Sequence, residues 1–102
     1  MEKVYILFGE EACRLTEDIL DVAAIDPEDF GEKDARCFSD EDLEVATPVI
    51  REFKTKEEAV AYILGIADMD GWLKWNGISE EEVQELEKGK ERICDMKKEI
   101  AT

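Results

Sequence analysis

Hydrophobic and polar positions along the chain predict two strands, one at its beginning and one near its middle. The first segment, Lys3–Phe8, is apolar on both faces, which is typical of a central strand that is covered on both sides at least in part. Its two faces consist of Val4, Ile6 and Phe8, and of Tyr5 and Leu7. The second segment, Thr47–Phe53, contains Pro48, which has no N–H group for a β-ladder. Pro48 should therefore mark the start of this strand or an edge of the sheet.

Apolar residues at helical spacing predict two helices in the first two thirds of the chain. Residues 11–24 predict the first, for which Thr16 offers an alternative, later cap. The clearest helical pattern follows Thr55, which forms a capping box with Glu58. We expect the apolar stripe of this second helix to face the core, and it consists of Ala59, Val60, Ile63, Leu64 and Ala67.

The last part of the chain predicts a long helix with the same kind of start. Ser79 and Glu82 form its capping box, and acidic residues precede lysines in the order that the helix dipole favours. Gly89 lies on or beside the apolar face, where it lowers helix stability but allows a close approach of another backbone. That face consists of Val83, Leu86, Ile93, Met96 and Ile100.

Residues 25–46 lose this periodicity and predict an acidic, loop-rich excursion with short helical turns. Asp26-Pro27 is a typical helix start, and Ser39 is a cap that is followed by acidic residues in a first turn. Three apolar residues should hold the excursion against the core, and these are Phe30, Phe38 and Leu43.

The segment "DMDGWLKWNG", residues 68–77, predicts a short third strand between two turns. Asp70-Gly71 and Asn76-Gly77 are the turn signals, and residues 72–75 lie between them. The chain of 102 residues is then expected to form one α+β domain over residues 1–102. In this fold two or three helices pack on a small, about three-stranded sheet in two layers.

The same segment does not predict a calcium site. When Gly71 is aligned with the glycine of an EF-hand loop, the first, ninth and twelfth ligand positions are Ile66, Lys74 and Gly77. The chain has no histidine and no C-x-x-C motif, so we predict no metal site and no cofactor. Three widely spaced cysteines are predicted to be free, buried thiols without a disulfide, and these are Cys13, Cys37 and Cys94.

The net charge of −15 is concentrated in one third of the chain. Residues 10–44 hold 14 acidic residues and three basic ones, a net charge of −11. A solvated acidic face is the simplest explanation of such a run of charge. A surface that binds a basic protein is the more specific alternative. The candidate acidic residues of that surface are Asp40, Glu41, Asp42 and Glu44. The same charge disfavours direct binding of nucleic acid or of anionic membranes.

Trp72 and Trp75 are the other candidates for partner binding. The predicted strand places them on opposite faces, so at least one should lie in the core, and the other is a candidate interface anchor. The residue pattern predicts no catalytic site, since the chain lacks histidine and any Gly-rich phosphate loop. Cys13 beside Arg14 is more typical of a small apolar core residue than of a reactive thiol.

The sequence therefore favours a small, acidic, cytoplasmic, non-enzymatic module for protein–protein interaction. A more specific form of this hypothesis is an acidic mimic of nucleic acid that inhibits a basic DNA- or RNA-binding protein. A rival hypothesis is an accessory subunit or small-molecule-binding domain of an enzyme complex, and a third is a structural homodimer.

Overall fold

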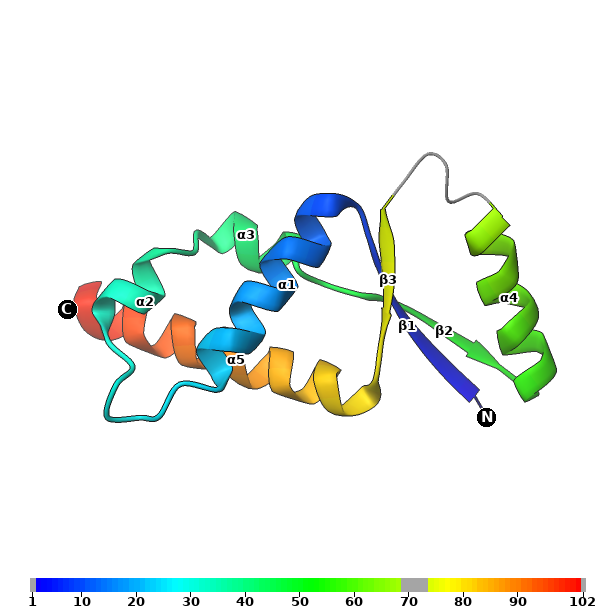
Figure 1. Ribbon diagram of the computed structural model, residues 1–102. Helices are drawn as coiled ribbons and strands as arrows, with labels where there is room; N and C mark the ends of the chain where they lie inside the picture. Colours follow the sequence, from blue (N-terminus) through cyan, green and yellow to red (C-terminus); the bar gives the residue numbers. More distant parts are fainter. Residues whose placement is uncertain (1, 69–73, 102) are drawn as a thin grey trace.

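The computed structural model of the protein describes residues 2–68 and 74–101. Its strands and helices alternate in an α+β arrangement, and Figure 1 shows the sheet near the middle of the long axis. In chain order the elements are β1 (Glu2–Phe8), α1 (Glu10–Ala23), α2 (Glu32–Arg36), α3 (Asp40–Val45), β2 (Val49–Phe53), α4 (Lys56–Asp68), β3 (Trp75–Ile78) and α5 (Glu80–Ala101).

The three strands form an open antiparallel sheet in the order β2-β1-β3. The register pairs Tyr5 with Ile50 of β2 and with Ile78 of β3. The predicted central position of the first strand is thus confirmed. Pro48 immediately precedes β2, which is an edge strand, as expected for a residue that cannot donate to the ladder.

Helices lie on both faces of this sheet, as the apolar residues on both faces of the first strand predicted. Ile6 and Leu7 point to opposite faces, and each is 1% exposed. Leu7 packs with Ile78 and with the first turn of α1. On the other face α4 contacts β1 and β2, and the rings of Phe53 and Tyr62 lie 5.2 Å apart.

The largest hydrophobic core lies between helices rather than on the sheet. Helix α1 packs along α5, and the short helices α2 and α3 close the open side of this pair (Figure 1). Phe38 and Leu43 are buried and Phe30 is half-buried, so the expected contacts of residues 25–46 with the core are confirmed. The buried members of this core are Leu15, Ile19, Val22, Ala35, Phe38, Leu43, Ala46, Leu86 and Ile93.

Gly89 lies at the crossing of α1 and α5. A Cβ atom at this position would lie 2.8 Å from both the backbone oxygen and the Cγ2 atom of Ile19. It would also lie 3.2 Å from the Cβ atom of Ala23. Any side chain here would push the two helices apart, so the predicted close backbone approach is confirmed.

The helix starts predicted at Ser39, Thr55 and Ser79 are also confirmed, whereas Asp26-Pro27 begins only a turn and α2 starts after Gly31 instead. Ser39 and Asp42 exchange hydrogen bonds at the start of α3, and Ser79 and Glu82 do so at the start of α5. At α4 the Glu58 N–H donates to Oγ1 of Thr55, and the Glu58 carboxylate accepts from the N–H of Lys54. The alternative cap at Thr16 is wrong, because Thr16 is buried in the middle of α1.

The third strand is displaced from its predicted position. It comprises residues 75–78 instead of 72–75, so Asn76 and Gly77 pair with β1 rather than forming a turn. Pairing with a long central strand outweighs the turn preference of this dipeptide. The expected Asp70-Gly71 turn and Trp72 lie outside the described residues.

Three of the five residues in the apolar stripe predicted to be buried on α4 are exposed, namely Val60, Leu64 and Ala67. Ala59 is 6% exposed and Ile63 is half-buried, but Val60 is 46% and Leu64 60% exposed. Among the described residues the main contacts of this helix are with β1 and β2, and these contacts leave the second row of the stripe exposed. The prediction of a wholly inward-facing stripe is therefore wrong.

The molecule is elongated for its length. Its radius of gyration is 15.6 Å and its dimensions are 49 × 29 × 20 Å, against a radius of about 13 Å for a compact domain of 100 residues. Figure 1 shows the reason, since α4 lies at one end and the four helices α1, α2, α3 and α5 lie toward the other. We call these four helices the helical half, and the three strands with α4 the sheet half.

Candidate protein-binding surface

An acidic groove of about 490 Å³ lies between α1 and the α2–α3 segment. Apolar residues line it together with aspartates from three helices, so it combines hydrophobic contact with negative charge. Its buried lining residues are Leu15, Val22 and Phe38. The surrounding aspartates are Asp18, Asp21, Asp34 and Asp42. We refer to this feature as the acidic groove.

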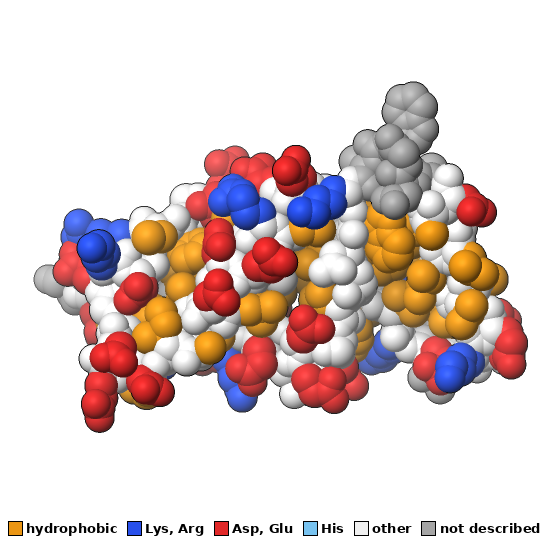
Figure 2. Space-filling view, viewed as in Figure 1, with side chains coloured by type: hydrophobic (Ala, Val, Ile, Leu, Met, Phe, Trp, Pro, Cys, Tyr) orange, Lys and Arg blue, Asp and Glu red, His pale blue; other side chains and the backbone are white. Residues whose placement is uncertain are grey.

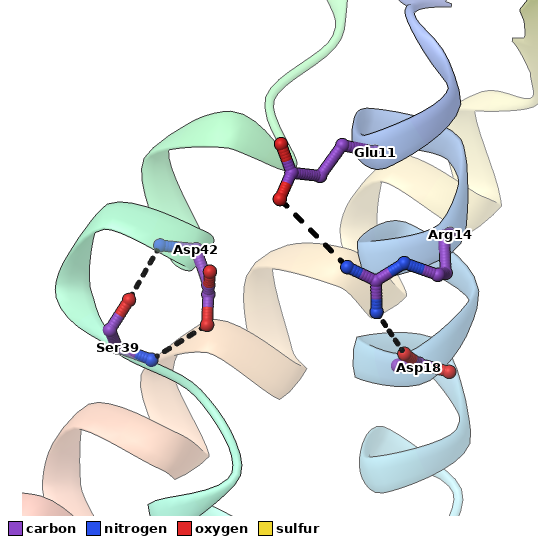
Figure 3. A network of polar contacts seen from close by, with 5 residues as sticks. All are labelled: Glu11, Arg14, Asp18, Ser39 and Asp42. Carbon is purple, nitrogen blue, oxygen red and sulfur yellow. Dashed lines mark hydrogen bonds and ion pairs between the residues drawn. The ribbon is translucent and has the colours of Figure 1, made fainter.

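Local helix capping fixes two of these aspartates. Asp34 Oδ2 accepts a hydrogen bond of 3.0 Å from the backbone N–H of Gly31 at the start of α2. Asp42 Oδ2 accepts one of 3.0 Å from the N–H of Ser39, whose Oγ accepts from the Asp42 N–H at 3.1 Å (Figure 3). Capping orients both carboxylates and leaves each with a second oxygen that can accept further hydrogen bonds.

Arg14 is the basic residue that lines the acidic groove. Its guanidinium lies between two carboxylates of its own helix, 3.6 Å from Asp18 and 3.9 Å from Glu11 (Figure 3). All three side chains are about half exposed, and solvent-exposed pairs of this kind stabilise by at most about 1 kcal/mol. The ion pairs therefore partly neutralise the groove but are weak enough to be exchanged for a partner's basic group.

The structure does not bring the sequence-predicted residues together at one site. Asp42 lines the acidic groove, whereas Asp40 lies 3.7 Å from Lys97 Nζ on α5. Glu41 and Glu44 are exposed on α3 and do not line the groove. Trp75 is half-buried in β3, opposite Phe8 of β1, and thus belongs to the sheet half. Trp72 lies outside the described residues.

Sequence reasoning missed the groove because its residues come from three separate helices. Arg14, Asp18 and Asp21 follow one another at helical spacing, so the sequence contained the signal that these three share a face of α1. Nothing in the local pattern placed Asp34 and Asp42 opposite that face, because the path of residues 25–46 depends on where their apolar residues dock.

Cys13 is a buried structural thiol, as expected. Burial raises the pKa of its thiol, nearby Lys74 lowers the pKa, and Glu17 raises it further. The thiol lies 3.9 Å from the backbone oxygen of Leu7, in the contact between α1 and the sheet. All three cysteines are free, but the expectation that all are buried is wrong, since Cys37 is exposed beside the acidic groove.

Two basic residues of α5, Arg92 and Lys90, connect this helix to segments far away in the sequence. The Arg92 guanidinium donates hydrogen bonds of 2.8 and 2.6 Å to the backbone oxygens of Val22 and Ile25 and lies over the ring of Phe30. Helix α1 has no basic residue in its own last turn, so Arg92 supplies the positive charge that a helix C-terminus favours. Lys90 Nζ donates to Thr47 Oγ1 at 3.1 Å, and burial lowers the pKa of this lysine.

The described residues contain no group of three or more histidine, cysteine, aspartate or glutamate residues placed to hold a metal ion. In the same part of the chain, no helix has the length and apolar character needed to cross a membrane.

Comparison with known proteins gives no match: no family model matches the chain, and no curated protein or solved structure is significantly similar to it.

Proposed function

We propose that the protein is a non-enzymatic interaction module that binds a basic protein partner in the acidic groove. The observation that carries this proposal is the convergence of four aspartates from three helices around a hollow with an apolar lining. Arginine and lysine side chains combine an apolar stem with a cationic head, so a groove of this composition suits them.

The distribution of charge over the molecule supports the proposal. Residues 10–45 and 79–102, which contain the helices of the helical half, hold 22 acidic and eight basic residues, a net charge of −14. The other residues have a net charge of −1. Figure 2 shows acidic side chains over much of the helical half in this view. Such a one-sided field accelerates association with a basic partner.

The binding experiment uses an arginine-rich peptide as probe and measures its affinity by calorimetry at low and at physiological salt. The test variant is Asp18→Asn/Asp21→Asn, which removes two groove carboxylates and leaves the caps of α2 and α3 intact. The control variant is Glu41→Gln/Glu44→Gln, which removes two charges from exposed positions outside the groove.

Both variants change the net charge equally, so general attraction weakens equally in the two. We expect the groove variant to lose at least about tenfold more affinity than the control, since each lost charge-assisted hydrogen bond contributes about 1.5–3 kcal/mol and about 1.4 kcal/mol corresponds to a factor of ten. Equal losses in the two variants would contradict a defined groove and leave only a solvated acidic face. Capture of partners from the native lysate with both variants then identifies the protein that the groove binds.

Nucleic-acid mimicry is the narrower form of the same proposal. It predicts that the captured partner binds DNA or RNA and that the nucleic acid competes with this protein for it. A captured enzyme without such activity would instead favour the role of an accessory subunit.

A further inference from the structure

The outer face of α4 carries exposed apolar residues and a shallow groove. Its central residues, Val60 and Leu64, are 46% and 60% exposed. Together with Ala61 they line a groove of about 380 Å³ at whose end lie Lys56 and Glu57. Figure 2 shows hydrophobic side chains gathered over α4 in this view, in contrast to the acidic helical half. We call the row Lys56, Val60, Leu64 and Asp68 the outer ridge of α4.

Gly65 lies beside this ridge, and none of the described residues packs against it. A Cβ atom at Gly65 would meet no described atom within 4 Å, although glycine in a helix interior lowers helix stability relative to alanine. The other helical glycine, Gly89, is in close contact with Ile19 at the crossing of α1 and α5. Ala61 and Gly65 thus form a shallow row that permits another helix to approach closely.

The charge of this end of the molecule points to a second copy of the chain as the occupant. Two molecules of net charge −15 repel each other in most orientations. Contact through α4 is the exception, because the residues outside the helical half have a net charge of only −1 and the acidic halves then point away from each other.

The outer ridge is also complementary to itself. Its residues are spaced by four, so in an antiparallel pair of α4 helices Lys56 of one copy lies opposite Asp68 of the other, and Val60 lies opposite Leu64. A two-fold dimer repeats both contacts. Within residues 2–68 and 74–101, neither Lys56 nor Asp68 forms an ion pair, and each lies at the helix end that its charge does not favour.

We propose that the protein forms a homodimer through an antiparallel crossing of two α4 helices. The outer ridge of each copy packs into the row of Ala61 and Gly65 of the other, which is the ridges-into-grooves packing that gives an interaxial angle of about −50°. This inference is independent of the acidic groove.

The experiment is sedimentation velocity of the full chain over a wide concentration range. The wild type is expected to change from monomer to dimer as concentration rises. Leu64→Gln should weaken dimerisation roughly tenfold to hundredfold, because each dimer loses the buried side chain twice. Val45→Gln is the matched control, since Val45 is 38% exposed on α3 in the helical half and should leave dimerisation unchanged.

A charge exchange tests the antiparallel arrangement. Lys56→Glu and Asp68→Lys should each weaken dimerisation, because each brings like charges together across the two-fold axis. The double variant should restore it, and both exchanges place charges where the helix dipole favours them, so α4 itself is not weakened. Circular dichroism confirms that each variant is folded.

Added salt separates this surface from the acidic groove. Screening should strengthen the dimer, because it reduces repulsion between two acidic molecules, whereas it should weaken binding of a basic peptide. A wild type that remains monomeric at all concentrations would overturn the proposal. So would a Leu64→Gln variant that dimerises as the wild type does, or a double variant that fails to recover.

Discussion

Replacement of Gly89 by alanine should destabilise the protein, although alanine is the better helix former. The new Cβ atom would lie 2.8 Å from the Ile19 backbone oxygen and from its Cγ2 atom. Carbon atoms in contact prefer about 3.5–4.0 Å, so relief requires that α1 and α5 move apart by several tenths of an ångström. A backbone oxygen cannot rotate away as a flexible side chain can.

The magnitude follows from two opposing terms. Overpacking in a core costs about 1–3 kcal/mol, and this crossing is tightly packed, since Ile19, Leu86 and Ile93 are each 0% exposed. The gain in helix propensity from glycine to alanine is about 1 kcal/mol. We therefore expect a net loss of up to about 2 kcal/mol, which lowers the melting temperature by about 4–8 °C for each kcal/mol in a domain of this size.

Gly65→Ala is the matched control for this measurement. It makes the same chemical change in a helix where the added Cβ atom meets no described atom within 4 Å. It should raise the free energy of unfolding by about 0.4–1 kcal/mol. Both variants are compared by urea denaturation at low protein concentration, so that self-association does not contribute. If both variants gain stability equally, the close crossing at Gly89 is refuted.

Four other predictions concern stability. Arg92→Met should cost about 3–6 kcal/mol in urea denaturation, because it removes two hydrogen bonds from a charged group to the backbone oxygens of Val22 and Ile25, each contributing about 1.5–3 kcal/mol. A loss below about 1 kcal/mol in the same assay would contradict this role. Thr16→Val should be neutral or raise stability by about 1 kcal/mol, since among the described residues the buried Thr16 hydroxyl has no hydrogen-bond partner; a clear loss in the same assay would mean that the hydroxyl is satisfied. Burial raises the folded-state pKa of Cys13 above its ordinary value of 9.0. The unfolded chain therefore loses this proton at lower pH than the folded one, and the free energy of unfolding should fall as pH rises above 9.0. In melts at several pH values, Cys13→Ala should not show this loss of stability. Physiological salt should raise the melting temperature relative to low salt by screening the charge of the helical half, and a flat or falling melting temperature would show that the acids are already compensated.

The order and type of the elements were predictable because local signals agreed with the tertiary contacts. Ser39, Thr55 and Ser79 each precede acidic residues in the first turn of a helix, and all three act as caps. The double-sided apolar pattern of Lys3–Phe8 likewise identified the central strand. Pro48 likewise predicted the start of β2 and its position at the edge of the sheet. This was possible because the lack of an N–H group is a property of the residue itself.

The parts that were not predictable depend on which partner an element finds. Asn76-Gly77 has a strong preference for a turn, yet it forms part of β3. Asn76 pairs with Leu7 and Gly77 pairs with Ile6, so the dipeptide extends along the free side of β1. The α4 stripe is wide enough to pack against two neighbouring elements. Its width does not reveal that, among the described residues, only the inner row packs against the sheet. Asp34 and Asp42 line the acidic groove because Phe38, which lies between them in the sequence, packs into the core of the helical half. That packing joins segments far apart in the sequence, so the local pattern does not show it.

The two proposed surfaces lie at opposite ends of an elongated molecule, and this placement has a functional consequence. In a dimer formed through α4, the two acidic grooves would lie in separate helical halves on either side of the contact, so one partner with two basic sites could bind both. Linking two weak contacts in this way raises the apparent affinity by about 10²–10⁴ without any new contact, provided that the spacing matches. Leu64→Gln leaves each groove intact, so it should weaken binding of a bivalent basic probe but not of a single arginine-rich peptide. Equal affinity of the wild type and this variant for the bivalent probe would show that the two surfaces work independently.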